Sequence, residues 1–160
     1  MDRILIVDDE FLIRYTLEEG LKDRGYDAYS AATVEEGLEF VRKYHPGVLL
    51  LDNLLENSVG MDEIVNFKNA DEELQVIMMT AYGSVSQAVE ATKRGAYDYI
   101  LKPFDTQMVL SRIRTAVNEE SAQNHVINTV YENGKNMLKK SYNLEADVTD
   151  IIHEIGVPAH

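Results

Sequence analysis

Residues 47–60 read GVLLLDNLLENSVG, and the apolar run inside this stretch stops at Asp52. A short continuous apolar run after Pro46 and Gly47 predicts a strand that is buried on both faces, as in a parallel sheet covered by helices. An ionised carboxylate at the edge of an apolar core is costly unless a positive group lies beside it. The stretch therefore predicts both a buried strand and a partner for Asp52.

The sequence on either side of this stretch repeats the same unit. We expect strands at residues 3–7, 26–31, 47–52, 74–79 and 97–101, and helices at 11–21, 33–44, 62–69, 84–94 and 105–118. Thr33 and Ser84 each open a capping box, and Asp105 is a candidate N-cap. Five alternations of strand and helix with short connections predict an α/β fold, in which helices cover both faces of a doubly wound, five-stranded parallel sheet.

Composition narrows the class of protein. A chain of 160 residues can form one domain with an appendage. The formal net charge of −13 argues against a nucleic-acid surface built from these residues, and the lack of cysteine excludes disulfides and thiolate metal sites. No apolar run approaches the roughly 18 residues of a membrane span, and no leader opens the chain. We expect a cytoplasmic protein without membrane contact.

Polar residues recur where the predicted strands end. Asp8 and Asp9 follow the first strand, Asp52 ends the third, Thr80 follows the fourth and Lys102 follows the fifth. Considered alone, most of them have an ordinary structural explanation: acidic residues favour a helix N-terminus, and lysine is usually solvated. Asp52 is the exception, because a carboxylate at the end of an all-apolar strand has no evident structural purpose. Ligands of such sheets bind beyond the carboxyl ends of the strands. Together, these residues predict one shared pocket.

The residue types in this pocket favour phosphoryl transfer. Three clustered carboxylates raise the pKa of one of them or bind a divalent cation. Oxygen ligands without His or Cys select Mg²⁺. A carboxylate oxygen of Asp52 can then act as the nucleophile, while Lys102 and Thr80 contact the phosphoryl oxygens.

Three segments carry a resemblance to a known family: ILIVDDE, VLLLD and VIMMTAYGSVSQAVEATKRGAYDYILKPFD. They resemble the receiver domain of two-component response regulators over residues 1–120, and the last is similar to nitrogen-regulation-type receivers. The resemblance implies a flavodoxin-like (CheY-like) fold. It implies that Asp52 is the phosphoacceptor. It implies that Asp8, Asp9, Asp52 and the Leu54 carbonyl are the ligands of Mg²⁺ (or Mn²⁺). It also implies a set of phosphate-binding and switch residues: Thr80, Ala81, Tyr99, Lys102 and Pro103, the last after a cis peptide bond.

The same resemblance implies a mechanism and partners. The donor would be a phosphohistidine on a sensor histidine kinase or a histidine phosphotransfer protein. The chain would be a phosphoacceptor that assists its own phosphorylation and dephosphorylation, not an enzyme. Phosphorylation would draw Thr80 toward the phosphoryl group and Tyr99 inward, although residue pattern alone also fits a half-buried Tyr99 with its hydroxyl outward. This would remodel the face formed by the fourth helix, fifth strand and fifth helix, and control homodimerisation and transcription.

Two positions after Asp52 depart from the family pattern. Asn53 stands where the family usually has an apolar residue, and Glu56 where it usually has proline, whereas Gly60 falls on the family's loop glycine. We expect a more mobile loop, with a further negative charge near the pocket.

Two other classes of protein remain open. A phosphatase of the haloacid-dehalogenase type also uses a strand-end aspartate and Mg²⁺, but it needs an aspartate where this chain has Leu54. A receiver-like interaction module that no longer accepts phosphate is the other alternative.

The last forty residues are expected to form an appendage. Apolar spacing predicts a helical linker over residues 121–145. Residues 147–160, DVTDIIHEIGVPAH, are similar to the beginning of the DNA-binding effector domain of the stage-zero sporulation A regulators, so residues 146–160 would be the truncated start of such a domain. Binding to DNA would then require the missing part. The alternatives are a sensor-kinase phosphorylation motif at His153 and, more weakly, a zinc site of His153 and His160.

Overall fold

The computed structural model describes residues 2–81 and 83–118. The expected linker, the expected start of an effector domain and the alternatives for His153 lie outside these residues. The described residues form one parallel sheet of five strands in the order β2-β1-β3-β4-β5. The expected doubly wound α/β fold is therefore confirmed.

The element bounds follow the sequence prediction closely. The strands are β1 (Arg3–Val7), β2 (Asp27–Ala31), β3 (Val48–Asp52), β4 (Gln75–Thr80) and β5 (Asp98–Leu101). The helices are α1 (Phe11–Asp23), α2 (Val34–Tyr44), α3 (Gly60–Ala70), α4 (Val85–Lys93) and α5 (Thr106–Asn118). Predicted strand starts are within one residue of those observed. The largest difference at a helix start is at α3, which begins at Gly60 instead of Asp62.

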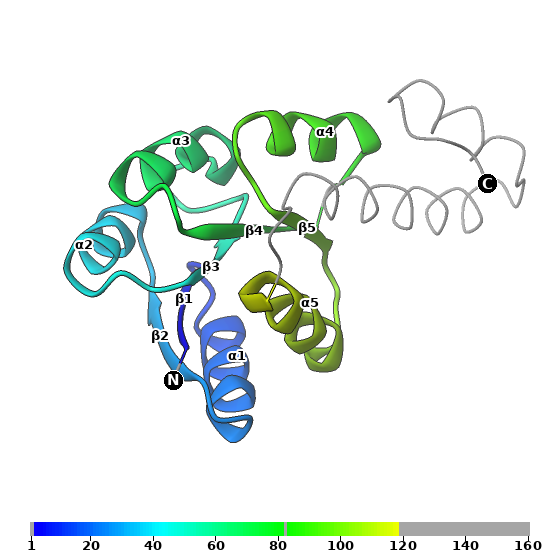
Figure 1. Cartoon of the computed structure of the whole chain (residues 1–160). Helices are drawn as coiled ribbons and strands as arrows, with labels where there is room; N and C mark the ends of the chain where they lie inside the picture. The colour runs from blue at the N-terminus through cyan, green and yellow to red at the C-terminus, as the bar shows by residue number, and fades with distance from the viewer. Residues whose placement is uncertain (1, 82, 119–160) are drawn as a thin grey trace, which may run out of the picture.

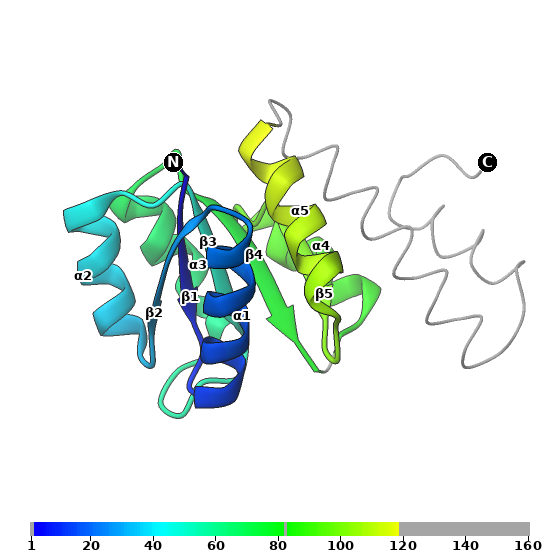
Figure 2. The ribbon, with the colours of Figure 1, turned by 90° about the horizontal axis from the view of Figure 1, so that it is seen from below.

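The sheet separates two apolar cores. Helices α2, α3 and α4 pack on one face of the sheet, and α1 and α5 pack on the other (Figures 1 and 2). Every residue of β3 is buried, and its side chains alternate between the two cores: Leu49 and Leu51 lie in one, Val48 and Leu50 in the other. Burial on both faces explains why this strand is a continuous apolar run.

The helix caps read from the sequence are present. The Thr33 hydroxyl accepts the amide hydrogen of Glu36 at 3.2 Å, and the Ser84 hydroxyl accepts that of Gln87 at 3.1 Å. Asp105 accepts the amide hydrogen of Met108 at 2.8 Å. Each of these bonds satisfies an amide that the first helical turn leaves without a partner.

The apolar spacing in α1 is only partly a core pattern. Leu17 and Leu21 are buried, and Ile13 packs against the same core. The apolar spacing of the sequence predicts that Phe11, Leu12 and Tyr15 belong to the same pattern, but they are 65%, 73% and 55% exposed. The buried stripe uses positions four residues apart, and these three side chains lie on the other side of the first turns.

No helix within residues 2–81 and 83–118 is long and apolar enough to cross a bilayer.

Candidate functional site

The candidate site lies at the carboxyl ends of β1 and β3, where the strand order reverses. The chain passes from β1 outward to β2, and then returns to β3 on the other side of β1. The helices that follow β1 and β3 consequently lie on opposite faces of the sheet, which leaves a crevice at this edge. Asp8 directly follows β1, and Asp52 is the last residue of β3.

Three carboxylates meet at this crevice. Asp8, Asp9 and Asp52 each offer one oxygen, and these oxygens all lie within 4.8 Å of one another. Asp8 is fully buried and Asp52 is 4% exposed, whereas Asp9 is partly exposed. The Asp8 carboxylate accepts the amide hydrogen of Glu10 at 2.8 Å, which fixes its orientation at the start of α1. The sequence-based expectation that these residues converge is confirmed.

Lys102 supplies the positive charge that the buried strand end requires. Its Nζ lies 3.0 Å from Oδ2 of Asp8 and 3.0 Å from Oδ1 of Asp52. The Lys102 amide donates to the Thr80 carbonyl at 2.7 Å, which ties the end of β5 to the end of β4. The Lys102–Pro103 peptide bond is cis, as expected.

The charges of the site do not balance. Burial raises the pKa of the Asp52 carboxyl from 3.8 to about 6; the hydrogen bond from Lys102 opposes this rise, and the charges of Asp8 and Asp9 add to it. Burial lowers the pKa of the Lys102 ammonium, but its hydrogen bonds to Asp8 and Asp52 reverse that effect and the net pKa is raised. One ammonium thus faces three carboxyl groups, and the arrangement is electrostatically suited to bind a further cation.

Thr80 and Tyr99 lie beside each other on the α4 side of the sheet. Tyr99 is 3% exposed, and its hydroxyl donates to Oε1 of Gln87 in α4 at 3.3 Å. Burial raises the pKa of the Tyr99 hydroxyl to about 12, against smaller opposing effects of hydrogen bonds with the Ser84 backbone and the Thr80 side chain. The expectation of a half-buried Tyr99 with its hydroxyl outward is therefore corrected, and the ring lies inward in this structure. The space comes from Gly83, where a Cβ atom would collide with Leu101 and come within 3.2 Å of the Tyr99 hydroxyl.

The remaining predicted residues flank the pocket. Leu54 lies in the loop between β3 and α3, pairs with Val59 in an isolated bridge, and exposes 52% of its surface. Ala81 and Pro103 are exposed next to the ends of β4 and β5. Glu56 and Asp9 line the same small hollow, so a further acidic residue lies beside the pocket, as expected.

Sequence reasoning missed how the loop after Asp52 is held. Asn53 was noted only as a departure from a pattern, yet its Oδ1 accepts the amide hydrogen of Met61 at 2.9 Å. Its carbonyl accepts the Gly60 amide at 2.7 Å. Asparagine is a common helix cap, but this residue lies seven positions before the helix, so a local capping rule could not find it. Gly60 is required because a Cβ atom there would collide with the Asp52 carbonyl oxygen.

Comparisons with known proteins agree with this geometry. The sequence model of one family, the response regulator receiver domain, matches residues 4–114. The chain is 36% identical over 118 residues to the sporulation initiation phosphotransferase F of Bacillus subtilis, a match that covers 74% of this chain and 92% of that protein. It is 33% identical over 135 residues to the probable transcriptional regulator ycf27 of Cyanophora paradoxa; there the match covers 84% of this chain but only 55% of the relative.

Solved structures are similar as well. The beryllofluoride-activated NtrC4 receiver domain dimer, solved in solution, matches with a TM-score of 0.71 and 35% identity, over 76% of this chain and all of that one. A CheY-like receiver domain protein from Methanospirillum hungatei matches with a TM-score of 0.70 and 30% identity, over 74% of this chain and 94% of that one.

Proposed function

Because this chain belongs to the response regulator receiver domain family, we propose that it accepts a phosphoryl group on Asp52 from a phosphohistidine donor in a Mg²⁺-dependent reaction. The observation that carries the proposal is the grouping of Asp8, Asp9, Asp52 and Lys102, which come from the ends of three strands. Receiver domains are in general signalling modules and not enzymes, and we assign this chain the same role.

The donor set fits Mg²⁺, with Mn²⁺ as the second choice. Three carboxylate oxygens from Asp8, Asp9 and Asp52 are hard ligands, and the cluster contains no His or Cys. The backbone carbonyl of Leu54 would complete the protein's share of the ligands. When bound, the ion would neutralise negative charge that develops on the phosphoryl oxygens.

The transfer requires positioning more than covalent assistance from the protein. A free oxygen of the Asp52 carboxylate attacks the phosphorus of the phosphohistidine, and the phosphorus–nitrogen bond breaks. The product is a mixed anhydride on Asp52, and the imidazole of the donor takes up a proton from water. The Lys102 ammonium lies 3.0 Å from Oδ1 of Asp52, and Thr80 ends the neighbouring strand β4, so we assign both side chains to binding the equatorial oxygens.

The exposed side of α1 is a suitable surface for the donor protein. Phe11, Leu12 and Tyr15 are exposed next to the acidic cluster, and the rings of Phe11 and Tyr15 stack with centroids 6.1 Å apart. Apolar groups on a rim of charged residues are typical of protein contacts. We assign this surface to a sensor histidine kinase or histidine phosphotransfer protein. The similarity to a sporulation phosphotransferase supports a place in a phosphorelay.

The phosphoryl group would act on α4 and β5 through Thr80 and Tyr99. Since Tyr99 is already inward, phosphorylation would stabilise this position and not create it. The affected face comprises α4, β5 and α5, and a phosphorylation-dependent homodimer through it would parallel the activated NtrC4 dimer. Control of transcription would require an effector domain, and the chain spans about half the length of the ycf27 regulators that it matches.

Mass spectrometry of the intact protein after treatment with acetyl phosphate and Mg²⁺ tests the proposal. We expect the wild-type chain to gain one phosphoryl group, and the Asp52→Asn variant to gain none. Continuous release of phosphate from an ester such as p-nitrophenyl phosphate would instead indicate a phosphatase. A folded wild-type chain that gains no phosphoryl group under these conditions would indicate an interaction module that does not accept phosphate.

A further inference from the structure

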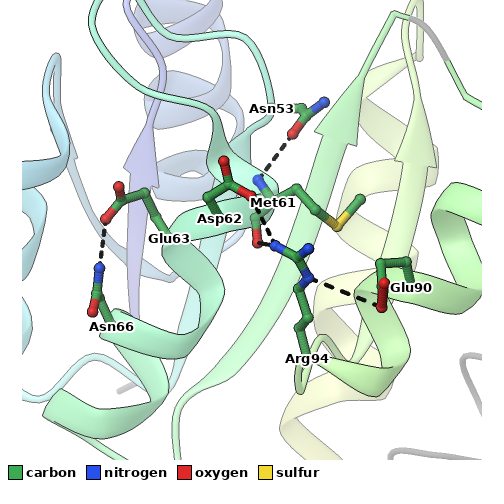
Figure 3. Close-up of polar contacts among 7 residues, drawn as sticks. All are labelled: Asn53, Met61, Asp62, Glu63, Asn66, Glu90 and Arg94. Carbon is green, nitrogen blue, oxygen red and sulfur yellow. Dashed lines mark hydrogen bonds and ion pairs between the residues drawn. The ribbon is translucent and has the colours of Figure 1, made fainter.

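Two side chains on opposite sides of the first turn of α3 bind the backbone of the same residue, Met61. The Met61 amide donates to Oδ1 of Asn53 at 2.9 Å, on the side of the sheet edge. The Met61 carbonyl accepts from Nη1 of Arg94 at 3.1 Å, on the side of α4. Figure 3 shows Asn53 and Arg94 on either side of this residue. Both polar groups of the Met61 backbone are therefore used to fix the turn in place.

Arg94 adds a second contact to the same turn. Its Nη1 lies 2.9 Å from Oδ1 of Asp62, and its Nε lies 4.0 Å from Glu90 in α4 (Figure 3). Arg94 is the C-cap residue of α4. The guanidinium thereby connects the carboxyl end of α4 to the amino end of α3, and both contacts with the turn come from Nη1.

Asn53 connects this turn to the pocket. It lies between Asp52 and Leu54, and its carbonyl accepts the Gly60 amide at 2.7 Å while its own amide donates to the Met79 carbonyl at 2.9 Å. Asn53 thus closes the loop of residues 54–59 at its base. A backbone ligand in this loop can only be directed correctly when the base of the loop is fixed.

We propose that Asn53 and Arg94 are positioning residues for the metal-binding loop: they hold Met61 from opposite sides and so fix the Leu54 carbonyl relative to the Asp52 carboxylate. This inference rests on the proposed function, because it assumes that Leu54 contributes to the Mg²⁺ site. Asn53 acts directly on the loop, and Arg94 acts through the first turn of α3.

The same contacts connect the metal site to α4. One end of α4 holds the turn through Arg94, while Gln87 near its other end contacts Tyr99. Coupling between two sites is reciprocal in free energy. If Arg94 helps the loop to bind Mg²⁺, then Mg²⁺ must in turn stabilise the contact between α4 and α3.

Calorimetric titration of the metal-free chain with Mg²⁺ tests the positioning role. Asn53→Leu keeps a similar side-chain shape but removes Oδ1, the acceptor for the Met61 amide. We expect it to raise the Kd for Mg²⁺ about tenfold, as for other groups that orient metal ligands. Arg94→Lys keeps the charge but replaces the planar guanidinium, whose Nη1 contacts Met61 and Asp62, by a shorter side chain, and we expect Mg²⁺ binding to weaken about threefold. Asn53→Ser, which can still accept a hydrogen bond, should recover part of the affinity.

Asn66→Ala is the matched control. Asn66 lies on α3 and donates to Glu63 at 2.8 Å on the exposed side of the helix, away from the loop (Figure 3). The Asn66→Ala variant should bind Mg²⁺ with the Kd of the wild type. Thermal unfolding of each variant shows whether it is folded, and a variant with a lower melting temperature but an unchanged Kd would show a purely structural role and overturn the inference.

Hydrogen exchange tests the reciprocal effect. Mg²⁺ should slow amide exchange at the carboxyl end of α4 in the wild type, and this protection should be smaller in Arg94→Lys at saturating Mg²⁺. Equal protection in both proteins would overturn the coupling through Arg94. If the wild type binds no Mg²⁺ at all, the proposed function fails and this inference with it; if the wild type binds Mg²⁺ and both variants match its Kd, the inference alone fails.

Discussion

Lys102 and Asp52 face each other across the carboxyl edge of the sheet, with Nζ of the lysine 3.0 Å from Oδ1 of the aspartate. The same Nζ is 3.0 Å from Oδ2 of Asp8. Strand β4 lies between β3, which ends at Asp52, and β5, which Lys102 follows, so this contact depends on the pairing of these three strands. The stability of the metal-free protein should therefore report directly on the charges of the site.

Asp52→Asn should stabilise the metal-free protein at pH 7.5. The folded-state pKa of Asp52 is about 6, above its ordinary 3.8, so the folded protein disfavours the ionised form despite the contact with Lys102. The free energy of unfolding that comes from the protonated Asp52 carboxyl is fully present below about pH 4. It is lost as the pH rises through about 6. The gain from the substitution should be at most about 3 kcal/mol at neutral pH and should shrink toward pH 4. Urea unfolding at several pH values measures it, and a destabilised variant at pH 7.5 would contradict the electrostatic account.

Mg²⁺ should raise the melting temperature of the wild type, because the ion binds the folded carboxylate cluster and not the unfolded chain. Protons compete for the same oxygens. We therefore expect the Mg²⁺ affinity to fall by about tenfold per pH unit once the pH is below about 6. Calorimetric titrations from about pH 5 to about pH 8 measure this dependence. An affinity that does not change over this range would show that Asp52 is not a ligand.

Lys102→Met should destabilise the metal-free chain at neutral pH by about 2 kcal/mol, because Asp8 and Asp52 are then left buried without their cation. Part of this loss should return when Asp52→Asn is added, and part when Mg²⁺ is added. Lys93→Met serves as the control, since Lys93 is exposed at the end of α4. Equal effects of the two lysine substitutions would mean that the contacts of Lys102 do not stabilise the fold.

The fold could be predicted from short-range patterns. The continuous apolar run of β3 and the caps at Thr33 and Ser84 each specify an element locally. The same patterns misread α1, because a helical repeat shows that apolar residues recur but not which of two stripes faces the sheet. Leu17 and Leu12 illustrate the difference, with 1% and 73% exposure.

That difference gives a prediction of its own. Leu17→Ala should cost about 2–5 kcal/mol of the unfolding free energy because it leaves a cavity in the core. Leu12→Ala on the same helix should change it by less than about 0.5 kcal/mol. Urea unfolding of the two variants measures both values. Similar losses for the two would show that the exposed side of α1 is covered in solution.

The charged residues of the site could be predicted from the sequence, but the contacts that support them could not. Strand-end positions suffice to bring Asp8, Asp9, Asp52 and Lys102 together, because parallel strands place their carboxyl ends at one edge. The contact of Arg94 with Met61 has no comparable local signal, since the two residues are brought together only by the packing of α4 beside α3. The inward position of Tyr99 likewise depends on the space at Gly83.

Binding of beryllofluoride, followed by fluorine NMR, tests the central claim most directly, because this phosphoryl analogue requires the acceptor, the metal and the lysine at the same time. The account predicts bound-fluoride resonances for the wild type with Mg²⁺, their disappearance when Mg²⁺ is removed, and none for Asp52→Asn. Bound resonances that persist in Asp52→Asn, or that do not depend on Mg²⁺, would contradict it.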